Sequence, residues 1–319
     1  AFHIIAIDIW LTSFRIVPLV NISTSRIKWE GKLRLSILCT CFVLGLHIAT
    51  PSASAEVIPV PSQATWADLK KTVDLPNGVK LAYSEMGNTD GEPLLLIHGY
   101  TDNSRSWSLL APHLNLKDYH VYAIDLRGHG KSSAPECCYT YPELANDAYL
   151  FMEAMKIGKA DVVGHSLGSL TAQLLAAQHP EKIDKVVLIS STINTGGGPG
   201  TWLWDNIAPL QPPVDPNGKF MMDWYWNPNP VDDAFIKPER EESAAVPLHV
   251  WKGVLWGVTT GDLSKTAPLV KAPMMIFWGD QDPLFDASHQ EKLKTAFPQA
   301  RYETFKGAGH NMFWEQPQK

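Results

Sequence analysis

The stretch Gly164-His165-Ser166-Leu167-Gly168 decides the fold of this chain, because a strand pattern ends where it begins and a helix pattern starts where it ends. Residues 161–163 (Asp-Val-Val) indicate a buried strand, and residues 170–177 indicate a helix. A serine between two glycines at such a turn sits on a sharp bend, where a Cβ at either flanking position would collide with neighbouring backbone. We therefore predict that Ser166 is an exposed nucleophile, with the positive end of the following helix directed at the site.

Short apolar runs recur on both sides of this stretch and alternate with amphipathic segments such as 141–155. Runs of this length suit strands that are buried on both faces of a parallel sheet. The turn Pro76-Asn77-Gly78 predicts one hairpin, between residues 71–75 and 79–83, before the alternation begins. The sequence therefore predicts an α/β fold, a mostly parallel sheet with helices on both faces. The apolar runs are residues 94–97, 121–124, 161–163, 186–189 and 274–277.

The alternation breaks between residues 192 and 271, in a segment rich in proline, glycine and tryptophan. The segment is too long for a simple connection, so we predict an inserted lid with helices of its own. This divides the core into two parts, residues 56–191 and 272–319. We expect most of the lid tryptophans to pack the lid on the core, and one or two to line a pocket. They are Trp202, Trp204, Trp224, Trp226, Trp251 and Trp256.

Residues 1–55 are predicted to be a leader and signal peptide that is removed. Lys32 and Arg34 precede an apolar run over residues 35–49, which is followed by the small-residue ending Pro51-Ser52-Ala53-Ser54-Ala55. This is the pattern of a secretory signal peptide, with cleavage after Ala55. The apolar run is short for a membrane span. We therefore expect an exported protein, periplasmic or secreted, with no stable membrane insertion after cleavage.

A serine hydroxyl needs a base within hydrogen-bond reach, and His310 is predicted to be that base. It lies in the small-residue loop 307–311 near the chain end, and the order serine, aspartate, histidine suits this architecture. The carboxylate that orients the imidazole should follow the strand at 274–277, where Asp280 and Asp282 compete. We favour Asp282, because it follows the turn and can reach toward the histidine loop. Asp280 suits a turn-former that bonds local backbone.

Chemistry at a carbonyl also needs donors for the developing oxyanion. The backbone N–H of Leu167 is placed by the turn after Ser166. We assign the second donor to the backbone N–H of Tyr100, since His98-Gly99 lets the chain turn sharply after the apolar run 94–97.

Charge and cysteine content exclude several other classes. The formal net charge is -6 and no basic stretch could track phosphates, so nucleic acid is not an expected partner. The chain has no CxxC pair, and we predict neither a metal site nor a cofactor. Cys137 and Cys138 are expected to remain unpaired thiols, because a bridge between adjacent residues strains the intervening peptide.

Five motifs in order resemble the α/β-hydrolase fold family. They are His98-Gly99, Asp125-Leu126-Arg127-Gly128-His129-Gly130-Lys131-Ser132, residues 164–168, Gly279-Asp280-Gln281-Asp282 and Gly309-His310. The resemblance covers residues 73–317 and is to the branch with carboxylesterases, lactonases, C–C bond hydrolases and cofactor-free haloperoxidases. It implies an acyl-enzyme on Ser166. Family members usually carry one more helix after the histidine loop; since the sequence stops at Lys319, we expect either that this helix is missing or that the sequence is truncated.

We expect hydrolysis of a carboxylic ester or lactone, since a lid rich in tryptophan and proline favours a small apolar or aromatic substrate. Serine as the nucleophile argues against epoxide hydrolases and haloalkane dehalogenases, which resemble this fold but use aspartate. C–C bond hydrolysis and haloperoxidase or perhydrolase activity remain alternatives, because those enzymes share the triad. A non-catalytic ligand receptor on the same fold is the alternative from a different class.

Overall fold

The computed structural model describes residues 56–319. The predicted leader, with its cleavage point after Ala55, lies outside the described residues. Within the part of the chain that is described, no helix has both the length and the apolar character needed to cross a bilayer.

A nine-stranded sheet forms the centre of the described chain, in the order β1-β3-β5-β4-β6-β7-β8-β9, with β2 beside β3. The strands from β5 to β9 along this order pair in parallel, and β1, β2 and β3 pair antiparallel. The predicted hairpin and the mostly parallel sheet are thus confirmed. The strands are β1 (Val57–Ile58), β2 (Lys71–Asp74), β3 (Lys80–Asn88), β4 (Glu92–Ile97), β5 (Tyr119–Ile124), β6 (Ala160–His165), β7 (Ile183–Ile189), β8 (Met274–Gly279) and β9 (Arg301–Phe305).

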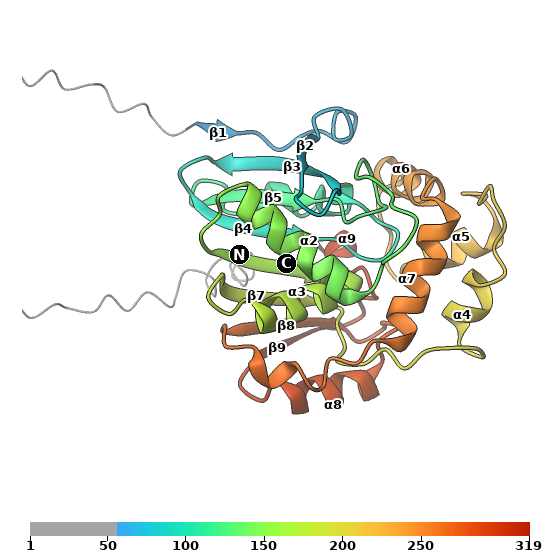
Figure 1. The fold of residues 1–319 in the computed structure, drawn as a ribbon. Helices are drawn as coiled ribbons and strands as arrows, with labels where there is room; N and C mark the ends of the chain where they lie inside the picture. Colours follow the sequence, from blue (N-terminus) through green and yellow to red (C-terminus); the bar gives the residue numbers. More distant parts are fainter. Residues whose placement is uncertain (1–55) are drawn as a thin grey trace, which may run out of the picture.

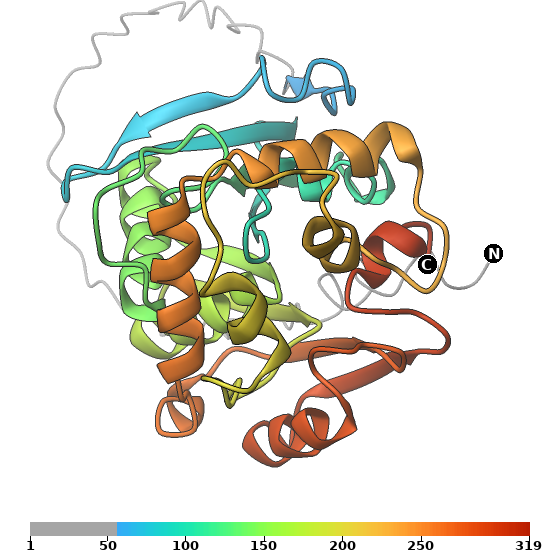
Figure 2. The ribbon, with the colours of Figure 1, turned by 90° about the vertical axis from the view of Figure 1, so that its right-hand side faces the viewer.

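Helices cover both faces of the sheet. In Figures 1 and 2, α2 (Tyr141–Ala154) and α3 (Leu167–Gln178) lie on one side and the short α9 (Met312–Glu315) lies on the other. Eleven of the twelve residues of α3 are buried, because the helix packs against β6, β7 and α2. The remaining core elements are α8 (Ala287–Ala296) and the 3-10 helices η1 (Ser104–Trp107) and η2 (Ala111–His113).

Residues 192–271, here called the insertion, carry four helices at one end of the sheet (Figure 1). This end faces the viewer in Figure 2, where α6 and α7 run in different directions across it. It is the end at which the parallel strands finish, where α/β folds place their sites. The elements are α4 (Trp202–Ile207), α5 (Lys219–Trp224), α6 (Asp233–Ala244), α7 (Leu248–Thr260) and the 3-10 helix η3 (Ala267–Leu269).

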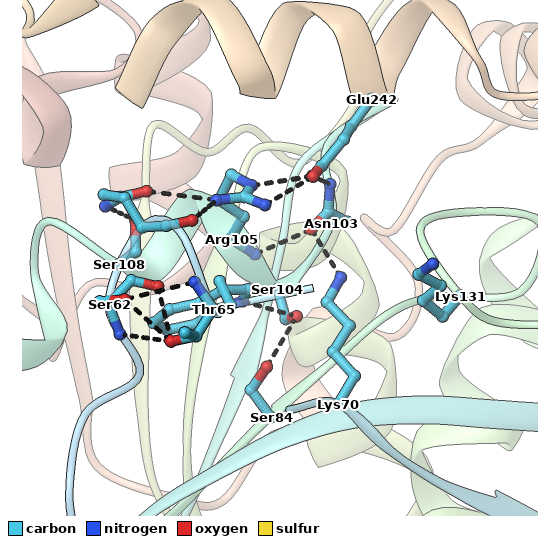
Figure 3. A network of polar contacts seen from close by, with 12 residues as sticks. Ser62, Thr65, Lys70, Ser84, Asn103, Ser104, Arg105, Ser108, Lys131 and Glu242 are labelled. Carbon is cyan, nitrogen blue, oxygen red and sulfur yellow. Dashed lines mark hydrogen bonds and ion pairs between the residues drawn. The ribbon is translucent and has the colours of Figure 1, made fainter. Parts of the chain in front are cut away.

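A buried polar network fastens the loop after β4 to two distant parts of the chain (Figure 3). Asn103 accepts a hydrogen bond from Lys70 at 2.8 Å and donates one to Glu242 of α6 at 2.8 Å. Lys70 also pairs with the buried Asp125 at 2.8 Å, and Arg105 pairs with Glu242 at 2.6 Å. The loop that follows Tyr100 is therefore held by the amino-terminal segment on one side and by the insertion on the other.

Cys137 and Cys138 form a disulfide, so the prediction of two unpaired thiols was wrong. Cys138 has a positive φ of 77°, a backbone conformation that few residues other than glycine adopt. A hydrogen bond of 2.9 Å from Arg127 to the carbonyl of Cys138 helps to hold it. Local sequence rules gave no sign of this turn.

Candidate active site

Ser166 stands where β6 ends and α3 begins, at a φ of 51° and a ψ of -118°. Few residues other than glycine adopt this backbone conformation, so the surrounding structure must hold the serine in it. A Cβ on Gly164 would collide with the carbonyl oxygen of Gly168, and one on Gly168 would collide with that of Ile97. Both glycines are therefore required by close backbone packing. The strained turn leaves Ser166 partly exposed at the end of the strand.

His310 and Asp282 lie together at the ends of β9 and β8. Nδ1 of His310 is 2.8 Å from Oδ2 of Asp282. The other oxygen of Asp282 accepts hydrogen bonds from the backbone N–H groups of Leu284 at 2.9 Å and Phe285 at 3.0 Å. Burial alone would raise the pKa of Asp282, but His310 and these two donors outweigh it and hold the pKa below its ordinary value. An ionised Asp282 places the ring proton on Nδ1 and leaves Nε2 free to accept one.

Asp280, the rival for this position, has a different partner. Its Oδ1 accepts a hydrogen bond of 2.7 Å from the backbone N–H of Gly307. It thereby ties the loop after β9 to the end of β8. The structure brings Asp282, and not Asp280, to the imidazole of His310.

The loop that presents His310 has two anchors that sequence reasoning missed. The carbonyl oxygen of His310 accepts a hydrogen bond from the hydroxyl of Ser190 at 2.6 Å and one from Nε2 of His165 at 3.1 Å. His165 is the residue before the nucleophile, and Ser190 follows β7. Their place at the ends of two neighbouring strands was the signal that could have pointed to them.

The two predicted backbone donors come from separate elements. Leu167 is the first residue of α3, and its N–H is among those that a helix leaves unpaired within its own first turn. Tyr100 follows β4, is buried, and its hydroxyl donates to the carbonyl oxygen of Trp251 in α7. Tyr100, Ser166 and Leu167 line the same cavity. Their arrangement fits an oxyanion site at the tip of the turn.

Two adjoining cavities lie between the core and the insertion. The larger, of about 520 Å³, is lined by Ser166 and His310 and walled by Trp202, Trp224 and Trp226. The smaller, of about 270 Å³, shares Ser166 with it and extends past apolar residues such as Leu203, Val258 and Phe285. Three lid tryptophans line the larger cavity, where one or two were expected. Trp251 is completely buried.

A second carboxyl, Asp102, lines the larger cavity and was not anticipated from the sequence. It is 5% exposed, and its Oδ1 accepts a hydrogen bond of 3.0 Å from the hydroxyl of Tyr225. Burial raises the pKa of Asp102 to about 7, against the opposing influence of Tyr225 and His310. Its position two residues after Tyr100, in a loop that must reach the site, was the signal available in the sequence.

Among residues 56–319, no group of three or more His, Cys, Asp or Glu side chains is arranged to hold a metal ion. Ser166, the two histidines and Asp102 line the larger cavity, and Asp282 reaches it through its hydrogen bond to His310.

Comparison with known proteins agrees with this geometry. A family model described as alpha/beta hydrolase fold matches residues 92–213 and 215–317. Lipase 3 from Moraxella sp. is 27% identical over 253 residues, which cover 75% of this chain and 78% of the relative. The crystal structure of a hydrolase from Pseudomonas aeruginosa is 25% identical with a TM-score of 0.67, covering 78% of this chain and 94% of that one. The enol-lactonase from Burkholderia xenovorans, 23% identical with a TM-score of 0.64 over 77% of this chain and 95% of its own, shares the fold.

Proposed function

The chain belongs to the α/β-hydrolase fold family and is a hydrolase, and from this we propose that it cleaves a carboxylic ester or a lactone. The observation that carries the proposal is the cavity in which a strained, partly exposed Ser166 meets the His310–Asp282 pair. The similarity to a lipase and the shared fold with an enol-lactonase support the same two bond types. In this proposal the catalytic residues are Ser166, His310 and Asp282.

The reaction runs in two steps. Oγ of Ser166 adds to the carbonyl carbon while Nε2 of His310 takes the hydroxyl proton, and the oxyanion accepts hydrogen bonds from the N–H groups of Leu167 and Tyr100. The intermediate collapses, the C–O bond to the alcohol breaks, and the alcohol leaves with the proton from His310. Water then gives a proton to His310 and attacks the acyl-enzyme, which releases the acid and restores the serine hydroxyl. Asp282 stays ionised throughout and stabilises the imidazolium.

We propose that the insertion acts as a lid and that the substrate is a small molecule with an apolar or aromatic group. Support comes from the three tryptophans that wall the larger cavity, since aromatic side chains favour apolar and aromatic ligands. The predicted export of the protein is a separate proposal. The mass of the protein recovered from the host of origin tests this proposal, because the mature chain should begin at Glu56.

The decisive experiment is labelling with a fluorophosphonate, followed by a substrate panel. We expect mass spectrometry to find the label on Ser166 and the enzyme to turn over p-nitrophenyl esters or lactones. Ser166→Ala should abolish both, whereas Ser264→Ala, at an exposed serine outside both cavities, should change neither. An unlabelled Ser166 would contradict the proposal. Turnover of only monochlorodimedone with peroxide, or of only C–C bond substrates, would support those activities instead.

A further inference from the structure

One wall of the larger cavity holds polar side chains that the proposed mechanism leaves unused. Asp102, His165 and Tyr225, together called the inner subsite, all line this cavity. Asp102 is 5% exposed and His165 is 1% exposed. Nδ1 of His165 is buried and has no hydrogen-bond partner among the described residues. It lies 4.0 Å from Oδ2 of Asp102, too far for a direct hydrogen bond.

The hydrogen-bond pattern fixes the state of His165. Its Nε2 lies 3.1 Å from the carbonyl oxygen of His310, which can only accept, so Nε2 carries the proton and donates. Burial, with the nearby His310, holds the pKa of His165 well below its ordinary value, so the ring is neutral. Nδ1 therefore presents a bare lone pair toward Asp102.

The surroundings of Asp102 favour a neutral carboxyl. Burial opposes ionisation of Asp102 and outweighs the hydrogen bond that Tyr225 donates to its Oδ1. Glu239 of α6 is also completely buried, and burial together with the nearby Asp102 raises the pKa of Glu239 well above its ordinary value. A protonated Asp102 can donate a hydrogen bond as well as accept one.

The distance between Nδ1 of His165 and Oδ2 of Asp102 suits one bridging oxygen. Two atoms 4.0 Å apart can both lie within about 2.8 Å of a bridging oxygen, a normal hydrogen-bond length. The absence of a side chain at Gly99 leaves room between these two atoms. A Cβ at that position would stand 2.8 Å from Nδ1 of His165 and 3.0 Å from Oδ2 of Asp102.

We propose that the inner subsite binds a hydroxyl group of the substrate, which donates to Nδ1 of His165 and accepts from Asp102. The inference rests on the proposed ester or lactone hydrolysis and narrows its substrate class to hydroxylated esters. A hydroxyl is both donor and acceptor, as the two facing groups require. A substrate carboxylate would meet a lone pair and an acid with no cation in the inner subsite, and is disfavoured.

The test uses pairs of esters that differ only by a hydroxyl in place of a methyl group. On the acyl side the pair is 3-hydroxybutanoate and 3-methylbutanoate, and on the alcohol side it is 2-hydroxypropyl and isobutyl butanoate. We expect kcat/KM of the wild type to favour the hydroxylated member of at least one pair by about 10-fold or more, since a buried group left unpaired is costly. A further ester, 2-ammoniopropyl butanoate, tests whether the inner subsite binds a cation.

The variant that removes the preference is Asp102→Leu combined with Tyr225→Phe. Replacing both partners of the Tyr225–Asp102 hydrogen bond avoids leaving a buried polar group alone, so the fold should survive. The preference should vanish or reverse in this double variant. Asp223→Asn is the matched control, because Asp223 lines the same cavity from the insertion but is exposed and should leave the ratio unchanged.

Equal kcat/KM within both pairs, a preference that survives in the double variant, or a stronger preference for the ammonium ester would each overturn the inference. Calorimetric binding of the intact pairs to Ser166→Ala reads the inner subsite without turnover. It should show the same preference, and equal affinities would also overturn the inference. If the proposed ester hydrolysis itself is wrong, the fluorophosphonate should leave Ser166 of the wild type unlabelled. This result distinguishes a failure of the proposed function from a failure of the inference.

Discussion

Two histidine–aspartate pairs meet at one cavity, which His310, His165 and Asp102 line and which Asp282 reaches through its hydrogen bond to His310. In the first, His310 and Asp282 are 2.8 Å apart, and in the second, His165 and Asp102 are 4.0 Å apart. Each aspartate is 5% exposed, so burial does not separate them. Asp282 receives two backbone N–H groups and an imidazole N–H, whereas the hydrogen bond found at Asp102 is the one from the hydroxyl of Tyr225. The pKa is accordingly lowered for Asp282 and raised for Asp102. Because the two carboxyls are equally buried, the close charge of His310 and the additional donors at Asp282 decide which carboxyl is ionised.

The two pairs also support each other. Nε2 of His165 donates to the carbonyl oxygen of His310, and the two imidazole rings lie 5.0 Å apart. The neutral pair thus helps to hold the loop of the pair that we propose for catalysis. Changing one pair should therefore affect the other through the position of this loop and through the charge of His310 near Asp102.

The largest expected difference between the pairs is in turnover. Asp282→Asn should lower kcat on a plain ester by about 10³- to 10⁴-fold, because the amide favours the wrong imidazole tautomer. Asp102→Asn should lower it by less than about 10-fold. Asp280→Asn serves as the control for a general effect on this loop and should also lie within about 10-fold. Similar losses of kcat in Asp282→Asn and Asp102→Asn would mean that the pairs are not distinct.

The first pair could be predicted from the sequence and the second could not, for a physical reason. Ser166 and Asp282 each follow a strand whose apolar run is visible locally, His310 lies in a small-residue loop after β9, and the ends of parallel strands meet at one edge. The state of Asp102 depends on Tyr225, which lies 123 residues later in the insertion. A helical period shows which face of α6 or α7 is apolar, but not where on the core that helix packs. The sheet could thus be predicted from the sequence, whereas the packing of the insertion on the core could not.

The contest between Asp280 and Asp282 shows the same limit at close range. Both follow β8 within three residues, and the sequence favoured one only by its reach. The structure separates them by partner, since Asp280 bonds the backbone of Gly307 and Asp282 bonds His310. A preference between neighbouring residues needs the position of the opposite loop, which local patterns do not contain.

A second difference between the pairs should appear in the pH dependence of stability. The pKa of Asp102 is about 7 in the folded protein and near 4 in an unfolded chain, so the unfolded state releases this proton first as pH rises. Burial of Asp102 therefore lowers the free energy of unfolding progressively between about pH 4 and about pH 7, by up to roughly 4 kcal/mol. Asp102→Asn removes this penalty. The free energy of unfolding of the variant, relative to that of the wild type, should therefore be higher at about pH 8 than at about pH 4. Denaturant unfolding at both pH values measures it.

Asp282→Asn should show the opposite slope. The folded pKa of Asp282 is below its ordinary value, so the stability it contributes is present above the unfolded pKa and is lost as pH falls through the folded pKa. The variant should be less stable than the wild type near neutral pH, with the gap closing in acid. Parallel slopes for the two variants would show that the two carboxyls do not differ in charge.

The smallest effect should come from Tyr225→Phe, which removes the hydroxyl that donates to Asp102. Below about pH 6 the carboxyl is neutral, and losing this hydrogen bond should cost about 1 kcal/mol of unfolding free energy. Above about pH 8 the carboxylate is charged, and the same loss should cost about 1.5 to 3 kcal/mol. The matched control is Tyr302→Phe, because Tyr302 donates to the neutral amide of Gln290 at 2.8 Å and its loss should cost the same at both pH values. If the cost of Tyr225→Phe is equally independent of pH, then Asp102 does not change charge in this range. The contrast between an ionised and a neutral pair would then rest on distance alone.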